Sequence, residues 1–146
     1  MIRVGRTIML LAAMQLSAAG VEVTSPGMPL RPCPDSPNCV SSLATDSAHR
    51  MEPWPFTATV AVTRDALEAI IRAEPRTRIV SVTESGVRAT FTSRLFRFVD
   101  DVEFHIDAEA RLIHFRSASR VGRSDLGVNR ARMERLHRAF LAQSRP

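Results

Sequence analysis

The sequence of 146 residues contains no lysine, only two cysteines and no apolar run of membrane-spanning length. All of its 20 basic residues are therefore arginine, a bias that codon usage in a GC-rich genome produces and that does not by itself indicate a function. The chain also lacks a P-loop, a dinucleotide-binding fingerprint and a nucleophile elbow. These absences exclude the common nucleotide-binding and serine-hydrolase signatures. The length of the chain fits a single small domain with its own core.

The first twenty residues have the features of an export leader. Arg3 and Arg6 give a positive start, residues 8–16 (IMLLAAMQL) form an apolar stretch, and residues 17–20 (SAAG) offer a small-residue cleavage site. The apolar stretch is shorter than the roughly 20 residues that cross a bilayer, and no cysteine follows it for a lipid anchor. We therefore predict a signal peptide over residues 1–19 and a periplasmic or secreted location in the cell envelope. An uncleaved N-terminal anchor is the alternative.

The basic balance gives little information about partners. Without the two leader arginines the formal net charge falls from +5 to +3, and the remaining arginines are scattered along the chain. No DNA-reading motif accompanies them, so we expect no nucleic-acid partner. The charge is compatible with an anionic small molecule or envelope polymer. We expect membrane contact only if the leader is uncleaved, and the sequence indicates no cofactor.

The two cysteines lie close together in residues 33–39 (CPDSPNC). An even, close pair in an oxidising compartment predicts a disulfide between Cys33 and Cys39. In the chain-entropy model, closing so short a loop contributes about 2 kcal/mol to stability. The spacing matches neither a C-x-x-C redox motif nor a zinc site, and no second Cys/His pair lies nearby. We therefore interpret the cysteines as a structural staple.

Proline content and periodicity divide the mature chain into two parts. Residues 20–56 hold most of the nine prolines and both cysteines, which predicts an irregular segment. An α+β core domain is predicted over residues 57–143. It begins with a strand over residues 57–62 and a helix over residues 63–75, whose apolar residues have helical spacing. A second helix is predicted over residues 129–143.

Between the two helices the sequence predicts two β-hairpins, each with one apolar and one polar face. Their turns are expected at residues 85–86 and 108–109. The opposing residues expected from these turns are Val82 with Ala89, Val80 with Phe91, Val102 with Phe115, Phe104 with Ile113, Asp101 with Arg116, and Glu103 with His114. With the first strand this gives an antiparallel sheet of about five strands with two helices on one face, an α+β fold.

The polar face of the second hairpin gathers charged side chains and admits three interpretations. The first is a solvated face with cross-strand ion pairs, each contributing about 0.2–1 kcal/mol. The second is a site for an anionic or sugar-like ligand. The third is acid–base catalysis by Asp101 and Glu103, which are weak candidates because no nucleophile or His–Asp relay accompanies them. A metal site is not expected, because the assumed pairing leaves His105 and His114 diagonal rather than opposite.

Strand alternation turns Asp100 toward the core, where a carboxylate is costly unless it is paired or hydrogen-bonded. Partners must then come from the polar segment 116–132, with an arginine of the final helix as the first choice. We predict a structural clasp that locks strand to helix. Its members are Asp100, Ser117, Ser119, Asp125 and Arg132.

The same segment offers an alternative role as an anion cradle. Glycines, serines and consecutive backbone N–H groups before a helix bind anions, helped by the helix dipole. The candidates for ligand or anion binding are Arg116, Arg120, Gly122, Ser124, Gly127 and Asn129.

Three stretches of the chain resemble domain of unknown function family 1499, a family of bacterial and plastid proteins. They are residues 33–42 (CPDSPNCVSS), 96–104 (FRFVDDVEF) and 116–132 (RSASRVGRSDLGVNRAR), in the family's order within residues 30–140. The resemblance implies a small exported or membrane-tethered domain and supplies no catalytic residues. One departure is Arg123, where the family usually has an aromatic residue, which puts in doubt any ligand role that depends on stacking there.

The positions that match the family pattern are Cys33, Pro34, Ser36, Pro37, Asn38, Cys39, Phe98, Asp100, Asp101, Glu103, Phe104, Arg116, Ser117, Ser119, Arg120, Gly122, Ser124, Asp125, Gly127, Asn129, Arg130 and Arg132. We expect a non-catalytic module of the cell envelope that binds a ligand or a partner. A hydrolase-like enzyme using the carboxylates of the second hairpin is the first alternative. A purely structural envelope component is the second.

Overall fold

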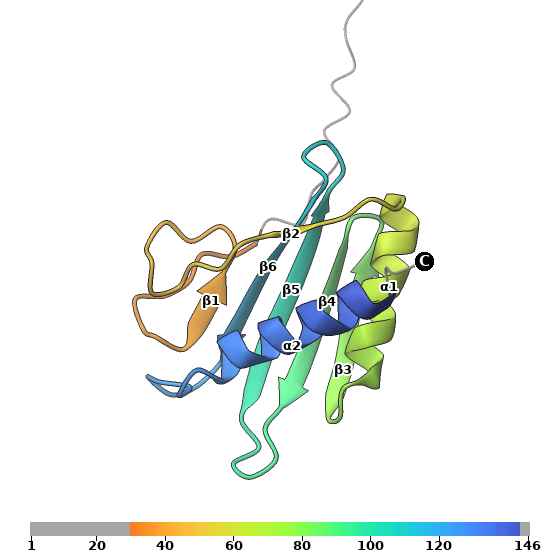
Figure 1. The fold of residues 1–146 in the computed structure, drawn as a ribbon. Helices are drawn as coiled ribbons and strands as arrows, with labels where there is room; N and C mark the ends of the chain where they lie inside the picture. Colours follow the sequence, from red (N-terminus) through yellow and green to blue (C-terminus); the bar gives the residue numbers. More distant parts are fainter. Residues whose placement is uncertain (1–29, 144–146) are drawn as a thin grey trace, which may run out of the picture.

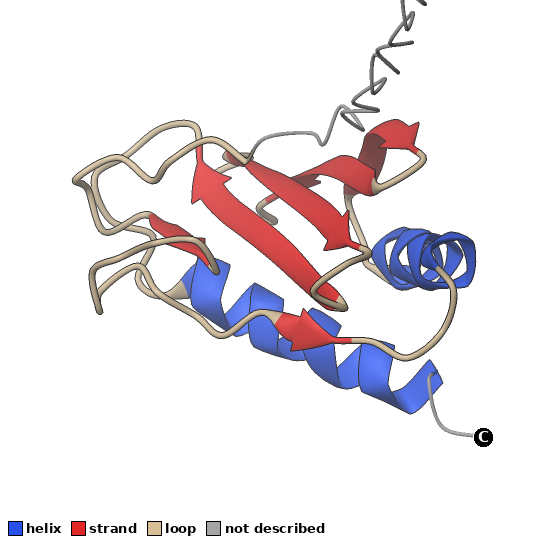
Figure 2. Ribbon diagram, turned by 90° about the horizontal axis from the view of Figure 1, so that it is seen from above, coloured by secondary structure: helices blue, strands red, loops and turns tan. Residues whose placement is uncertain are grey.

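The computed structural model describes residues 30–143; the predicted signal peptide lies outside the described residues. The elements are β1 (Cys39–Ser41), β2 (Trp54–Pro55), α1 (Val60–Ala73), β3 (Thr77–Thr83), β4 (Gly86–Thr92), β5 (Val99–Asp107), β6 (Leu112–Ser119) and α2 (Val128–Gln143). The strands form one antiparallel sheet in the order β1-β6-β5-β4-β3, with the short β2 also paired to β6. Both helices cover one face of the sheet, here called the inner face, and within residues 30–143 no helix covers the outer face (Figure 1 and Figure 2). The α+β prediction is confirmed, with six strands where about five were expected.

The core lies between the inner face and the helices, because alternate residues of a strand point to the same side. From β5 come Val102, Phe104 and Ile106, and from β6 come Ile113 and Phe115, all of them buried. The helices contribute Leu67, Ile70, Ile71, Met133, Leu136 and Phe140 to the same cluster. Burying each large apolar side chain is favourable by about 1.5–3 kcal/mol, so this layer holds the helices on the sheet.

Trp54 attaches the irregular N-terminal segment to this core. The side chain is buried, its ring lies 5.1 Å from the Phe115 ring, and it stacks on His137 with 4.7 Å between ring centroids. Trp54 also pairs with Ile113 of β6, and this pairing forms the short strand β2.

The first predicted strand is wrong, because residues 60–73 form helix α1. Thr59 ends the extended segment and caps the helix: its hydroxyl accepts a hydrogen bond from the Val62 N–H at 3.3 Å. The buried residues of α1 begin at Thr63 and continue with Leu67 one turn later. This helical spacing buries a complete apolar stripe and outweighs the strand propensity of the Val-Ala-Val stretch. Neither helix of the described residues is long and apolar enough to cross a membrane.

The register of the first hairpin also differs from the prediction. Thr83 pairs with Gly86, so the turn lies one residue earlier than expected, and Val82 lies opposite Val87 rather than Ala89. The register shifts again near Val80, where β3 has an irregularity of the β-bulge type. The extra residue turns Val80 away from the core, and its side chain is 58% exposed instead of facing Phe91 as expected.

In the second hairpin the observed pairing is shifted by two residues from the predicted register. Its turn has four residues rather than two, and the Asp107 carboxylate accepts hydrogen bonds from the N–H groups of Glu109 and Ala110 at 3.0 and 2.9 Å. A shift of two residues changes every partner but keeps each side chain on its predicted face. The observed opposing pairs are Asp101 with Ala118, Val102 with Ser117, Glu103 with Arg116, Phe104 with Phe115, His105 with His114, and Ile106 with Ile113.

Candidate functional site

The consecutive residues Asp100 and Asp101 of β5 point to opposite faces of the sheet. Asp100 lies on the inner face and is 4% exposed, whereas the side chain of Asp101 is 23% exposed on the outer face. Two separate polar clusters are built around them, and they have different surroundings.

The inner cluster joins β5 and β6 to α2. The Asp100 carboxylate contacts the guanidinium of Arg132, and both side chains are buried. The same guanidinium donates to the Ser117 hydroxyl at 3.0 Å and to the Asn129 side-chain oxygen at 2.7 Å, and it lies 4.8 Å from the centre of the Phe91 ring. The buried charge is therefore compensated by a carboxylate, two further acceptors and an aromatic face.

Asn129 extends the inner cluster and is fully buried. Its amide nitrogen lies within hydrogen-bond distance of the Asn38 carbonyl, the Ser119 hydroxyl and the Asp125 carboxylate, at 3.0, 3.1 and 2.6 Å. Its side-chain oxygen accepts from Ser117 at 2.6 Å. Asn129 was predicted as a ligand residue, and the structure places its side chain inside this network of protein groups.

Asn38 is part of the inner cluster and was not singled out as a site residue from the sequence. Besides its carbonyl contact, it donates from its side chain to the Gly122 carbonyl at 2.6 Å. The available signal was its match to the family pattern, immediately before Cys39. The inner cluster thus also includes the cysteine segment, because Asn38 lies 84 residues before Gly122 in the sequence.

The loop that precedes α2 uses its amides internally. Asp125 accepts hydrogen bonds from the backbone N–H groups of Gly127 and Asn129, at 3.0 and 2.8 Å, and the Ser124 hydroxyl accepts from Leu126 N–H at 3.3 Å. Gly127 has a φ of +80°, a conformation that a residue with a side chain adopts only at a cost, and Gly122 likewise has +86°. Gly122, Ser124 and Gly127 therefore shape the turn, and the N–H groups of Leu126, Gly127 and Asn129 already have acceptors.

The disulfide between Cys33 and Cys39 is confirmed, with 5.7 Å between the two Cα atoms. Cys39 lies in β1 opposite Ala118 of β6, at the edge of the sheet. The bridge holds the preceding residues beside the outer face, where the Arg31 guanidinium donates to the Glu103 carboxylate at 3.2 Å.

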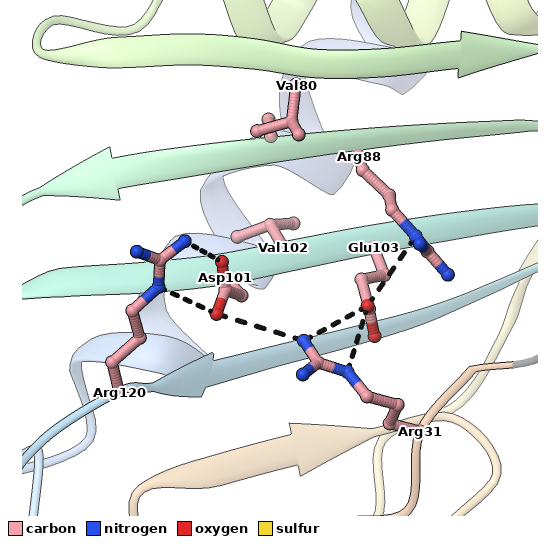
Figure 3. A pocket seen from close by; sticks show the side chains of 8 residues that line it. Arg31, Val80, Arg88, Asp101, Val102, Glu103 and Arg120 are labelled. Atoms are coloured by element: carbon pink, nitrogen blue, oxygen red, sulfur yellow. Dashed lines mark hydrogen bonds and ion pairs between the residues drawn. The ribbon is translucent and has the colours of Figure 1, made fainter.

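The outer cluster is built on Glu103, which is 3% exposed despite lying on the face without helices. Its carboxylate is surrounded by three guanidinium groups, those of Arg31, Arg88 and Arg116, at 3.2, 3.7 and 3.8 Å. Neighbouring Asp101 is held by Arg120 through two hydrogen bonds of 3.0 and 2.8 Å. Figure 3 shows most of these side chains around an open hollow of about 600 Å³, which we call the ion-pair hollow.

The charges of the outer cluster are only partly satisfied. The hydrogen bonds and charge of Arg120 hold the pKa of Asp101 below its usual value, and burial lowers the pKa of Arg116. Within the described residues, one oxygen of Glu103 and the Nε atoms of Arg88 and Arg116 are buried without a hydrogen-bond partner. Buried polar atoms without a hydrogen-bond partner lower the stability of a fold, so a further polar group that bonds to them is favourable.

A second hollow of about 640 Å³ adjoins the first on the outer face and shares Arg120 with it. The polar residues of this arginine hollow are Arg76, Arg78, Arg97, Arg120, Thr77, Thr90 and Thr92. No carboxylate of the described residues lines it. The side chains of Arg78 and Arg97 have neither an ion pair nor a hydrogen bond within residues 30–143. Sequence reasoning missed this hollow, because it depends on the observed register between β3 and β4, which differs from the predicted one.

The histidines do not assemble into a metal site. His105 and His114 lie opposite each other, contrary to the diagonal arrangement expected, yet no group of three metal-ligating side chains forms among the residues described. His49 contacts the Ser36 carbonyl at 3.0 Å and the Asp46 carboxylate at 2.7 Å, and these contacts raise its pKa. Burial instead lowers the pKa of His114 and of His137.

Comparison with known proteins places this architecture in a family. No curated protein matches the chain. A family model described as "Protein of unknown function (DUF1499)" matches residues 29–140, which is almost the whole described domain. That range covers the cysteine segment, both hairpins, the inner cluster and the outer face. The chain therefore belongs to the DUF1499 family of proteins of unknown function.

Proposed function

We propose that the protein is a non-catalytic binding module of the cell envelope that holds an anionic ligand on the outer face of its sheet. The observation that carries this proposal is the arginine hollow, which Arg78 and Arg97 line and which contains no carboxylate of the described residues. The disulfide supports an oxidising compartment outside the cytoplasm.

The chemistry of the outer face matches phosphate or carboxylate groups. A guanidinium presents a rigid fork of N–H donors that fits both groups through two parallel hydrogen bonds. Threonine hydroxyls beside it add neutral donors. Six arginines and two carboxylates line the two hollows together, so the face carries excess positive charge. An anion would relieve the repulsion in the arginine hollow, where the side chains of Arg78 and Arg97 have no carboxylate partner within residues 30–143.

A titration with two small anions tests the proposal. We expect the protein to bind inorganic pyrophosphate or citrate, measured by isothermal titration calorimetry at low salt. Arg78→Gln and Arg97→Gln should each weaken binding about tenfold or more, because a charge-assisted hydrogen bond contributes about 1.5–3 kcal/mol. Arg138→Gln is the matched control, since Arg138 is an exposed α2 residue with no ion pair in the described chain.

Two results would contradict anion binding at this site. One is an equal loss of affinity in all three variants, which would indicate non-specific attraction to net charge. The other is the absence of binding heat together with an unchanged melting temperature for both anions. That outcome would favour a purely structural envelope component, because a ligand that binds the folded state must raise its stability.

Acid–base catalysis by Asp101 and Glu103 has less support. A general acid that works near neutral pH needs a raised pKa, whereas Arg120 lowers the pKa of Asp101. Glu103 is buried among three arginines that neutralise it. Under the binding proposal, Asp101→Asn changes anion affinity and leaves the fold intact.

A further inference from the structure

The connections β4–β5 and β6–α2 expose a group of large apolar side chains. In the first connection Leu95 is 78% exposed and Phe96 is 69% exposed, and the Phe96 ring stacks on that of Phe98 at 5.5 Å. In the second connection Val121 and Leu126 are exposed, the latter to 93%. We call these five residues the apolar tip.

The two connections lie at the same end of the sheet, as Figure 1 shows. β6 runs antiparallel to β5, so the end of β6 lies beside the beginning of β5. The contact is direct, because the Arg120 N–H donates to the Val99 carbonyl at 3.0 Å. The apolar tip therefore belongs to one end of the molecule.

The shape of the β4–β5 connection is fixed by its own backbone. Ser93 N–H donates to the Phe98 carbonyl at 2.8 Å, and Phe98 N–H donates to the Ser93 hydroxyl at 2.9 Å. The loop is thus closed by hydrogen bonds that do not involve the exposed side chains. The rings of Phe96 and Phe98 therefore lie on a hydrogen-bonded loop and are not part of the hydrophobic core.

Arginines surround the apolar tip. Arg94, Arg97 and Arg123 lie in the two connections, and none has an ion pair or a side-chain hydrogen bond within the described chain. The acidic residue of these connections, Asp125, is occupied by the backbone N–H groups of the turn before α2. Exposed Leu and Phe side chains flanked by uncompensated arginines form the composition that binds the interface of an anionic membrane.

We propose that the apolar tip docks end-on to the surface of an anionic lipid bilayer. The leucine and phenylalanine side chains enter the interface, and the flanking arginines contact lipid phosphates. The sequence led us to expect membrane contact only through an uncleaved leader, and the tip provides a second route that survives cleavage. Arg97 lines the arginine hollow and also flanks the tip, so the two proposals are separated through Arg78, which lines the hollow and is not part of the tip.

A site-specific fluorescence measurement on the full chain separates the tip from the leader. The single tryptophan, Trp54, is buried, so Phe96→Trp adds a reporter at the tip. Val62→Trp is the matched control with similar exposure, 57%, in the first turn of α1. That turn lies at the opposite end of the sheet, beside the β5–β6 turn, where Arg111 donates to the Ala58 carbonyl at 2.9 Å.

With vesicles of phosphatidylglycerol and phosphatidylcholine, we expect a blue-shifted emission for Phe96→Trp and quenching by lipids brominated on the acyl chains. Vesicles of phosphatidylcholine alone should give a much smaller response. The Val62→Trp emission should not change. Adding Arg94→Gln or Arg123→Gln to the Phe96→Trp chain should weaken its vesicle partition about fivefold each, the effect of one arginine near an anionic surface.

Three outcomes would overturn the proposal. The first is an equal response of both tryptophan positions, which would assign binding to the leader or to non-specific adsorption. The second is no response at Phe96→Trp with anionic vesicles. The third is a concentration-dependent blue shift without vesicles, accompanied by a dimer in analytical ultracentrifugation, which would make a second copy of the chain the occupant. Arg78→Gln should weaken small-anion binding about tenfold or more and leave the vesicle response intact, so the two proposals fail separately.

Discussion

Replacing Asp100 by alanine tests whether the inner cluster stabilises the fold. Arg132 would remain buried and would keep its contacts to Ser117, Asn129 and the Phe91 ring, but it would lose its carboxylate partner. Removing one partner of a buried ion pair typically costs about 3–5 kcal/mol, and one charged hydrogen bond contributes about 1.5–3 kcal/mol. Because three contacts to the guanidinium remain, we expect a loss near the lower bound, about 3 kcal/mol of unfolding free energy.

The assay is urea and thermal unfolding followed by far-UV circular dichroism. A loss of this size lowers the melting temperature of a domain of this length by about 10 °C. Asp101→Ala is the matched control, because it removes the next carboxylate of the same strand from an exposed ion pair. Its melting temperature should stay close to that of the unmodified protein. Equal effects of the two substitutions, or an unchanged melting temperature for Asp100→Ala, would show that the Asp100–Arg132 contact does not stabilise the fold.

A double-mutant cycle with Arg132→Met identifies the interaction itself. If Asp100 and Arg132 stabilise the fold chiefly through each other, the double variant is more stable than the sum of the two single effects implies, by more than about 1 kcal/mol. Strict additivity would mean that the two residues act independently.

The remaining predictions concern the disulfide and the histidines. Replacing Cys33 and Cys39 together by serine should lower the unfolding free energy by about 2 kcal/mol, measured by urea unfolding, and an unchanged midpoint would contradict this. In an NMR titration His49 should titrate above its usual value of 6.5, and His114 and His137 below it. The contribution of His49 to the unfolding free energy is then complete below about pH 6.5 and is lost as the pH rises through its raised pKa. The contributions of His114 and His137 are instead complete above about pH 6.5 and are lost as the pH falls through their lowered pKa values. A His49 that titrates below His137 would contradict the assigned contacts.

Which face a residue occupies could be predicted from the sequence for the second hairpin, but the cross-strand partners could not. Alternation places Val102 and Phe104 inside and Asp101 and Glu103 outside in either register, since the two registers differ by an even number of residues. The partner depends on turn length, and the hydrogen bonds of the Asp107 carboxylate that close a four-residue turn give no periodic signal.

The sequence also failed where tertiary packing opposed local propensity. The β-branched residues Val60 and Val62 favoured the strand predicted over residues 57–62, yet the helix that begins at Val60 buries Leu67 and Ile71 against the sheet. In β3 a single irregularity reversed the expected face of Val80. The arginine hollow depends on that strand, so its assembly from residues far apart in sequence followed only from the three-dimensional structure.

The cysteine segment contributes to both clusters, and its two parts depend on the disulfide differently. Asn38 is held by the sheet itself, because the Ser119 N–H donates to its carbonyl at 3.0 Å. Arg31 lies on the other side of Cys33, where the disulfide ties the chain to β1. Opening the disulfide should therefore release Arg31 from Glu103 while the inner cluster keeps its contacts. The bridge thus matters most on the outer face, where a buried carboxylate would lose one of its three guanidinium partners.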